Sequence, residues 1–157
     1  MILAREIKPI RCADVFGNPD AHKLLAEYAA ECSIPSIGDI NPQPEMYTAM
    51  EHVGLLKCLG AYQWGVLVGF ANVLTSVLPH YGRKVATIES LFVAKASRPD
   101  GIGKELMQAV EQYAKSAGCT SILYSAPAGG KLERLLYLKS MRKKGYSHTN
   151  SVFCRSL

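Results

Sequence analysis

The chain has 157 residues, 48% apolar and 20% charged, a composition that is ordinary for a globular protein and argues against a disordered or fibrous one. Its length suits one domain over residues 1–157, and no apolar run approaches the roughly 18 residues that a membrane span needs. Because residues 1–10 also lack the long apolar core of a signal peptide, we expect a cytoplasmic protein without membrane contact.

The first half of the chain is predicted to contain strands and two helices. Asn18 is an N-cap candidate followed by Pro19, a combination typical of a helix start. Gln63-Trp64-Gly65 separates two β-rich runs and predicts a hairpin. The predicted elements are a strand over residues 2–10, a helix from Asn18 that ends before Pro35, a helix over 45–52, and strands over 55–62 and 66–78.

The central stretch, residues 85–117, changes its hydrophobic period at a turn. Residues 85–94 are rich in β-branched and aromatic residues and predict a buried strand, interrupted by the single acid Glu89. Breaker residues follow over 97–103. From Ile102 the apolar residues recur at helical spacing until Gly118, a C-cap candidate. The order is therefore strand, glycine-containing turn and amphipathic helix.

The last third of the chain predicts a strand over residues 120–125, a helix over 131–144 and terminal strand material over 146–157. The complete order is β-α-α-β-β-β-α-β-α-β. By themselves these elements indicate a single α/β domain.

The turn between the central strand and helix has the features of a phosphate site. Gly101 and Gly103 allow the backbone to approach a ligand closely, and the first helical turn offers N–H groups and a favourable dipole. Arg98 and Lys104 add positive charge. A dinucleotide fingerprint would need Gly in place of Leu106, and a P-loop would need Gly in place of Arg98.

The motif Arg98-x-x-Gly101-x-Gly103 resembles the acyl-CoA-binding motif of the GCN5-related N-acetyltransferases. The resemblance extends to Val93, five residues before the Arg, and to the Gly-Ile-Gly opening of the helix. It implies the fold of that family: a mostly antiparallel mixed sheet flanked by helices. It also implies an enzyme that transfers the acetyl group of acetyl-CoA, as co-substrate, directly to a primary amine.

The resemblance further implies which residues hold the cofactor. The strand backbone at Leu91, Phe92 and Val93 would hold the pantetheine arm and polarise the carbonyl, although these side chains can equally be core. The turn would bind the phosphates through Arg98, Pro99, Asp100, Gly101, Ile102, Gly103 and Lys104.

Glu89 is the predicted catalytic base. It lies four residues before Val93, where several family members also carry Glu. A carboxylate in an apolar strand is uncommon unless it is paired or functional, and partial burial would make it more basic. A Glu paired with Lys or Arg, and a Glu that binds the amine through water, are the alternatives.

The general acid is where the sequence departs from the family pattern. The family often has a Tyr four residues before a Gly-aromatic pair, but Met141 stands four residues before Gly145-Tyr146. Tyr137 lies one helical turn earlier on the same face and is the predicted substitute. A packed core aromatic, and a thiolate that leaves without an acid, are the alternatives.

The acceptor side is predicted to lie along residues 34–52 and 78–82. The segments offer polar side chains at Glu45, Tyr47, His52, His80 and Tyr81, of which Tyr47, His80 and Tyr81 are the predicted substrate-binding residues. His80 is also an alternative base. Nothing in the sequence specifies a small-molecule or a protein amine, and a homodimer stays open.

The remaining composition argues against other classes of site. Five cysteines and four histidines are scattered without metal-ligand spacing, so we expect no metal and reduced thiols. The net charge of +5 raises a nucleic-acid hypothesis, but no aromatic-rich basic motif supports it, and a polyanionic cofactor explains the charge equally well. A non-catalytic acyl-CoA-binding module is the second alternative.

Overall fold

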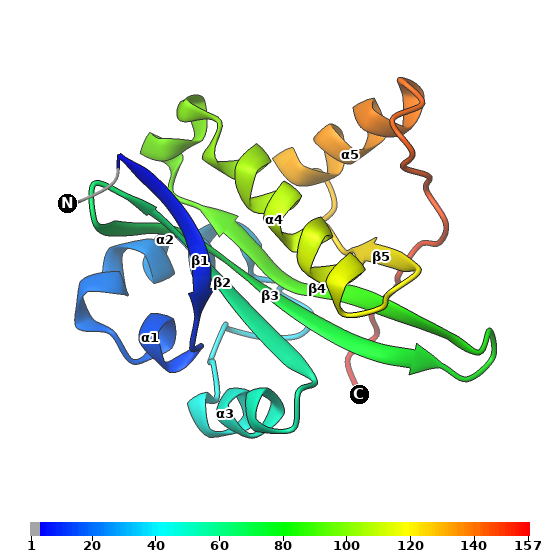
Figure 1. Cartoon of the computed structure of the whole chain (residues 1–157), viewed down its shortest axis with the longest axis horizontal. Helices are drawn as coiled ribbons and strands as arrows, with labels where there is room; N and C mark the ends of the chain where they lie inside the picture. Colours follow the sequence, from blue (N-terminus) through cyan, green and yellow to red (C-terminus); the bar gives the residue numbers. More distant parts are fainter. Residues whose placement is uncertain (1–3) are drawn as a thin grey trace. The chain divides into compact units, whose positions relative to one another are not determined.

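The computed structural model describes residues 4–157 and contains a five-stranded sheet in the order β1-β2-β3-β4-β5 (Figure 1). The strands are β1 (Arg5–Ile10), β2 (Leu56–Gln63), β3 (Val66–Leu78), β4 (Arg83–Val93) and β5 (Ser121–Tyr124). The α-helices are α1 (Ala13–Phe16), α2 (His22–Cys32), α3 (Pro44–His52), α4 (Ile102–Ser116) and α5 (Lys131–Met141). Two 3₁₀ turns, η1 (Pro19–Ala21) and η2 (Lys95–Asp100), complete the element order.

Contacts group the chain into two compact units. The first comprises residues 4–28 and 42–125 and holds the whole sheet, and the second comprises residues 29–41 and 126–157. The expectation of a single domain over 1–157 therefore stays a prediction.

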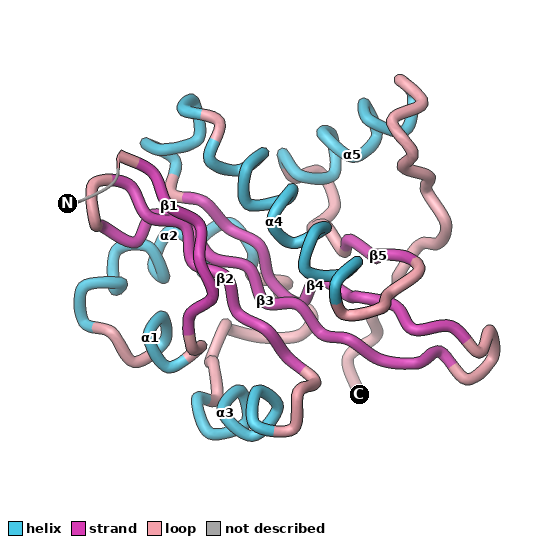
Figure 2. Tube along the Cα trace, in the orientation of Figure 1, coloured by secondary structure: helices cyan, strands magenta, loops and turns pink. Residues whose placement is uncertain are grey.

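The sheet is mixed but mostly antiparallel, as expected. Strands β1 to β4 pair antiparallel with their neighbours, and β5 pairs parallel to β4, as the arrows in Figure 1 indicate. Figure 2 shows the same strands in magenta and the helices in cyan. A parallel pair needs a crossover connection, and α4 supplies it between β4 and β5. The turn of interest is therefore the strand-to-helix junction of this crossover.

Helix α4 packs on one face of the sheet. Its apolar residues recur at i, i+4 spacing, so Ile102, Leu106 and Val110 are all at most 1% exposed. They pack against sheet residues that include Ala71 and Ile88. Because each fully buried aliphatic side chain contributes about 1.5–3 kcal/mol, this packing fixes the position of the helix start.

An aromatic cluster covers the other face of the sheet. Phe70 of β3 lies edge-on to Phe16 at 5.9 Å and to Tyr28 at 5.3 Å, and Tyr28 also contacts Phe92 of β4 at 5.6 Å. Phe70 and Ala71 are neighbours in β3, so the alternation of side chains along a strand places them on opposite faces. In Figure 1, α1 and α3 lie on the side of the sheet away from α4.

Most predicted elements are found with shifts of a few residues. The strand over 66–78 and the start of the helix at Ile102 match the structure. Asn18 caps η1 by accepting a hydrogen bond of 2.9 Å from the Asp20 N–H, and α2 follows. Residues 2 and 3 of the predicted first strand lie outside the described residues.

The prediction of a terminal strand over 146–157 was wrong. No strand forms there, and Val152 and Phe153 are 80% and 92% exposed. These two apolar residues are adjacent, so in a strand they would point to opposite faces and could not form one buried face. The preceding helix also ends earlier than predicted, at Met141 rather than 144, and Lys143 adopts a left-handed conformation with φ of 52°.

Candidate active site

A β-bulge in β4 determines where the Glu89 side chain points. The register between β3 and β4 passes from Asn72 opposite Ser90 to Val73 opposite Ile88, which leaves Glu89 as the extra residue. A bulge re-aims a side chain and shifts the alternation of the strand. Glu89 is accordingly exposed although its neighbours Ile88 and Ser90 are buried.

Two elements hold the Glu89 carboxylate. The Tyr47 hydroxyl, on α3, donates a hydrogen bond of 2.7 Å to Oε1, and Asn72 Nδ2, on β3, donates one of 3.4 Å to Oε2. None of the ion pairs found within residues 4–157 includes Glu89. The structure therefore does not support the alternative of a structural Glu paired with Lys or Arg.

Tyr47 is itself fixed by packing. Its ring stacks on Phe16 with centroids 4.8 Å apart and an interplanar angle of 25°. Burial raises the pKa of the Tyr47 hydroxyl well above its usual value, and the hydrogen bond to Glu89 raises it further. The hydroxyl consequently stays protonated and keeps donating at neutral pH.

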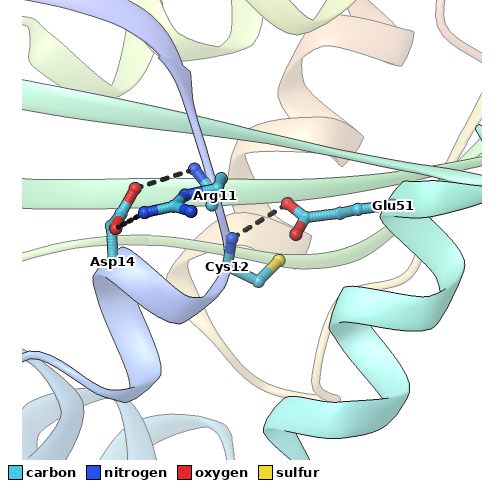
Figure 3. Close-up of polar contacts among 4 residues, drawn as sticks. All are labelled: Arg11, Cys12, Asp14 and Glu51. Atoms are coloured by element: carbon cyan, nitrogen blue, oxygen red, sulfur yellow. Dashed lines mark hydrogen bonds and ion pairs between the residues drawn. The ribbon is translucent and has the colours of Figure 1, made fainter.

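Glu51, one helical turn beyond Tyr47, anchors α3 to the junction between β1 and α1 (Figure 3). Its Oε1 accepts a hydrogen bond of 2.9 Å from the Cys12 N–H. In the same junction Asp14 accepts hydrogen bonds of 3.2 Å from the Arg11 N–H and 3.3 Å from the Arg11 guanidinium. Since residues i and i+4 share a helix face, this anchor helps to set the position of Tyr47.

The turn after β4 is held against the end of the strand by Arg98. Its Nε donates a hydrogen bond of 2.8 Å to the Val93 carbonyl, and its guanidinium lies 5.2 Å from the centre of the Phe92 ring. Gly101 then adopts φ of 81°, a left-handed conformation that glycine tolerates best, and α4 begins at the next residue. The Arg98-to-Gly103 motif is thus a well-defined turn between two elements.

Gln63, at the end of β2, forms hydrogen bonds with two residues around the same turn. Its Oε1 accepts a hydrogen bond of 3.0 Å from the Ser97 hydroxyl, and its Nε2 donates one of 2.7 Å to Asp100. One oxygen of the Asp100 carboxylate is therefore engaged with Gln63, which helps to fix the conformation of the turn.

These residues fit a cofactor that carries phosphate groups. The first turn of α4 offers N–H groups and the positive end of a helix dipole, with the cations Arg98 and Lys104 nearby in sequence. A Cβ added at Gly101 would meet nothing within 4 Å, so the backbone there is open to a ligand. Phe92, Val93 and Ile102 are at most 6% exposed and would offer main-chain groups alone.

Comparison with known proteins identifies the family. The model of the acetyltransferase (GNAT) family matches residues 21–141. The chain belongs to the GNAT acetyltransferase family. No curated protein matches its sequence.

Solved structures agree with this family fold. One is a ribosomal-protein-alanine N-acetyltransferase from Brucella melitensis biovar Abortus, with 20% identity, coverage of 99% of this chain and 100% of that one, and a TM-score of 0.71. A soil metagenomic aminoglycoside acetyltransferase has 16% identity, coverage of 98% and 97%, and a TM-score of 0.73. The Arabidopsis thaliana glucosamine-6-phosphate N-acetyltransferase has 14% identity, coverage of 98% and 98%, and a TM-score of 0.67.

Family membership confirms several predictions from the sequence. The fold is the expected one, and the chain belongs to a family of acetyl-CoA-dependent N-acetyltransferases, as predicted. Separately, among residues 4–157 no group of side chains could hold a metal ion, and no helix is long and apolar enough to cross a membrane. The expected absence of a metal stays a prediction.

The acetyltransferase does not bring all of its predicted site residues together. His80 and Tyr81 lie at the turn between β3 and β4, with their rings edge-on at 5.0 Å and Tyr81 70% exposed. Glu89 is six residues along β4 from Arg83, which is roughly 20 Å at the rise of a strand. Only Tyr47, of the three predicted substrate-binding residues, contacts Glu89.

Tyr137 and the remaining acceptor candidates, Glu45 and His52, are exposed side chains. Tyr137 lies on α5 in the second unit, 44% exposed, with its ring 5.3 Å from that of His148. Glu45 and His52 are exposed on α3. Their roles, and that of Tyr137 as general acid, stay predictions.

Proposed function

We propose that the acetyltransferase moves the acetyl group of acetyl-CoA directly to a primary amine, and that Glu89 accepts the first proton that the amine loses. The observation that carries this proposal is the bulge at Glu89. It exposes a hydrogen-bonded carboxylate on the strand that leads, four residues later, to Val93 and the Arg98–Lys104 turn. Base and cofactor site are thus parts of one continuous stretch of backbone.

Each part of that stretch has a distinct role in the proposal. The backbone and cations of residues 98–104 bind the phosphates, and the main chain of Leu91, Phe92 and Val93 orients the acyl arm. Acetyl-CoA supplies a thioester that is already activated. A primary amine that arrives as ammonium loses two protons. Glu89 receives the first, directly or through a water molecule, and this frees the lone pair that attacks the thioester. As the amide bond forms and the C–S bond breaks, the nitrogen loses its second proton to solvent, and the leaving thiolate takes up one proton.

The departing thiolate needs no protein group, but Tyr137 stays our predicted proton donor to it. Met141 stands where the family pattern has a tyrosine, and its side chain cannot donate a proton. Tyr137 lies one turn earlier on α5. The proton that converts the leaving thiolate to a thiol comes either from Tyr137 or from solvent.

The acceptor belongs to the class of primary amines. Structural neighbours named for ribosomal-protein alanine, aminoglycosides and glucosamine 6-phosphate suggest the first compounds to test. A suitable panel contains an alanyl peptide, kanamycin, glucosamine 6-phosphate and spermidine, with thiol release from acetyl-CoA as the readout.

The test of the base is Glu89→Gln, which keeps the shape of the side chain and removes its charge. We expect kcat/KM to fall by about 10²–10⁴-fold, with loss of the acidic limb of the pH profile and little change in melting temperature. Glu6→Gln is the matched control, because Glu6 is a half-buried strand acid that pairs with Lys8. Full activity and an unchanged pH profile in Glu89→Gln would transfer the role to water.

A further inference from the structure

Asn72 is a fully buried amide in the middle of β3. It is 0% exposed, and its neighbours in the chain, Ala71 and Val73, are also 0% exposed. Burying an amide among apolar side chains costs free energy unless each polar atom finds a partner. The groups that Asn72 bonds therefore indicate what an apolar residue at this position would lose.

The partners of Asn72 lie on the face of the sheet opposite α4. Nδ2 donates hydrogen bonds of 2.9 Å to Ser90 Oγ and 3.4 Å to Glu89 Oε2, and Oδ1 accepts one of 3.1 Å from the Cys12 thiol. The bulge explains how two consecutive residues of β4 reach one amide, because it breaks the strict alternation between Glu89 and Ser90.

The orientation of this amide is determined by chemistry. An ionised carboxylate only accepts hydrogen bonds, so the NH₂ group must face Glu89 and the carbonyl oxygen must face Cys12. The thiol must then be protonated in order to donate. A hydrogen bond with Cys58, together with burial, raises the pKa of Cys12 well above its usual value, which agrees with a neutral donor.

We propose that Asn72 is a positioning residue of the acetyltransferase, which holds the Glu89 carboxylate from inside the sheet while Tyr47 holds it from α3. The two donors bond different oxygens of the same carboxylate, so together they fix its plane as well as its place. This role rests on the proposed function only in that Glu89 is taken as the base. Asn72 itself is buried and touches neither substrate.

A double-mutant cycle tests the coupling between the two residues. Asn72→Leu removes the donor at similar volume, and Asn72→Ser is a smaller, polar second variant that cannot span the gap to Glu89. Both are made in the wild-type and Glu89→Gln backgrounds. Thiol release is followed with the panel amine that gives turnover, or with water as the acceptor if none does. Ser90→Ala is the matched control, since it removes the other bond of Nδ2 and leaves the one to Glu89.

In the wild-type background we expect kcat to fall roughly tenfold, as for the loss of one hydrogen bond to a charged group. KM for acetyl-CoA should stay within about twofold because residues 98–104 are untouched, and Ser90→Ala should lose less than about twofold in kcat. In the Glu89→Gln background, the Asn72 variants should cause no further loss, since their effect passes through the carboxylate.

The alternatives give different results. A loss that is equally large in both backgrounds, or unchanged kcat in the folded variants, overturns the positioning role. Unfolding of both Asn72 variants, with Ser90→Ala folded, would assign Asn72 to the fold and also overturn it. Full activity of Glu89→Gln itself is a separate result, because it contradicts the proposed function before the Asn72 variants are compared.

Discussion

The Tyr47 hydroxyl links the packing of α3 to the chemistry of Glu89. A tyrosine in an unfolded chain ionises with a pKa of about 10, and burial and the Glu89 hydrogen bond place the pKa of Tyr47 above that value in the folded protein. The folded state therefore keeps a proton that the unfolded state loses. The stability linked to Tyr47 is present below about pH 10 and is lost as the pH rises above it.

This linkage predicts the behaviour of Tyr47→Phe. The variant should be less stable than wild type at pH 7 by about 1 kcal/mol, because one hydrogen bond is lost. Between about pH 9 and 11 its free energy of unfolding should fall less steeply, because the titrating group is gone. Urea unfolding at several pH values measures both effects, and Tyr62 and Tyr113, whose pKa values are also raised by burial, cancel in the comparison. Parallel curves for the two proteins would contradict the prediction.

At the level of single residues, the sequence alone identifies those functional residues whose role depends on their neighbours along the chain. Glu89 stands out as an acid in an apolar strand, and the Arg98-to-Gly103 spacing identifies the turn without a structure. Asn72 gives no such signal, because its role depends on the register of β3 against β4 and on the bulge that breaks it. Glu51 is similar: its bond to the Cys12 N–H joins residues 39 positions apart.

At the level of elements, Gly101 connects a strand and a helix that are each fixed by packing. Its φ of 81° favours glycine, but a Cβ there would meet nothing within 4 Å. Gly101→Ala should therefore fold, with a loss of stability of about 1 kcal/mol. Affinity for CoA should fall more than this strain explains, because the new methyl group and the altered turn would face the phosphates that we propose to bind there.

Gly118 provides the matched control at the other end of α4. Its φ is 79°, and an added Cβ there also meets nothing within 4 Å, so Gly118→Ala should cost similar stability and leave CoA binding unchanged. Calorimetry with CoA and dephospho-CoA, together with melting curves, separates strain from ligand contact. Equal affinities in the two folded variants would place the cofactor site elsewhere.

Elements with strong periodicity are predicted well, and those that depend on pairing are not. The spacing of Ile102, Leu106 and Val110 is enough to predict α4, because a helix forms its hydrogen bonds within one segment. A strand needs a partner, so the pair Val152 and Phe153 suggested a terminal strand that does not form. Helix α1 has only four residues, too few to show any period.

For the whole molecule, the net charge of +5 should influence how the two substrates arrive. Acetyl-CoA is a polyanion, and a net positive field raises the rate of encounter with an anion at low ionic strength. A primary amine, the acceptor class that we propose, is a cation at neutral pH and would gain nothing from this field. The charge therefore favours the cofactor, which fits the cations Arg98 and Lys104 at its turn.

We expect a salt dependence of the reaction rate that comes from the phosphate groups of acetyl-CoA alone. The kcat/KM for acetyl-CoA should fall severalfold between about 20 and 200 mM salt, because the Debye length shrinks below about 10 Å over that range. Acetyl-pantetheine carries the same thioester without phosphate groups, and its kcat/KM should change little. Steady-state kinetics with both compounds at saturating amine measures the difference. Equal salt dependence would mean that the positive charge does not steer the cofactor, and that contacts at the turn alone determine its binding.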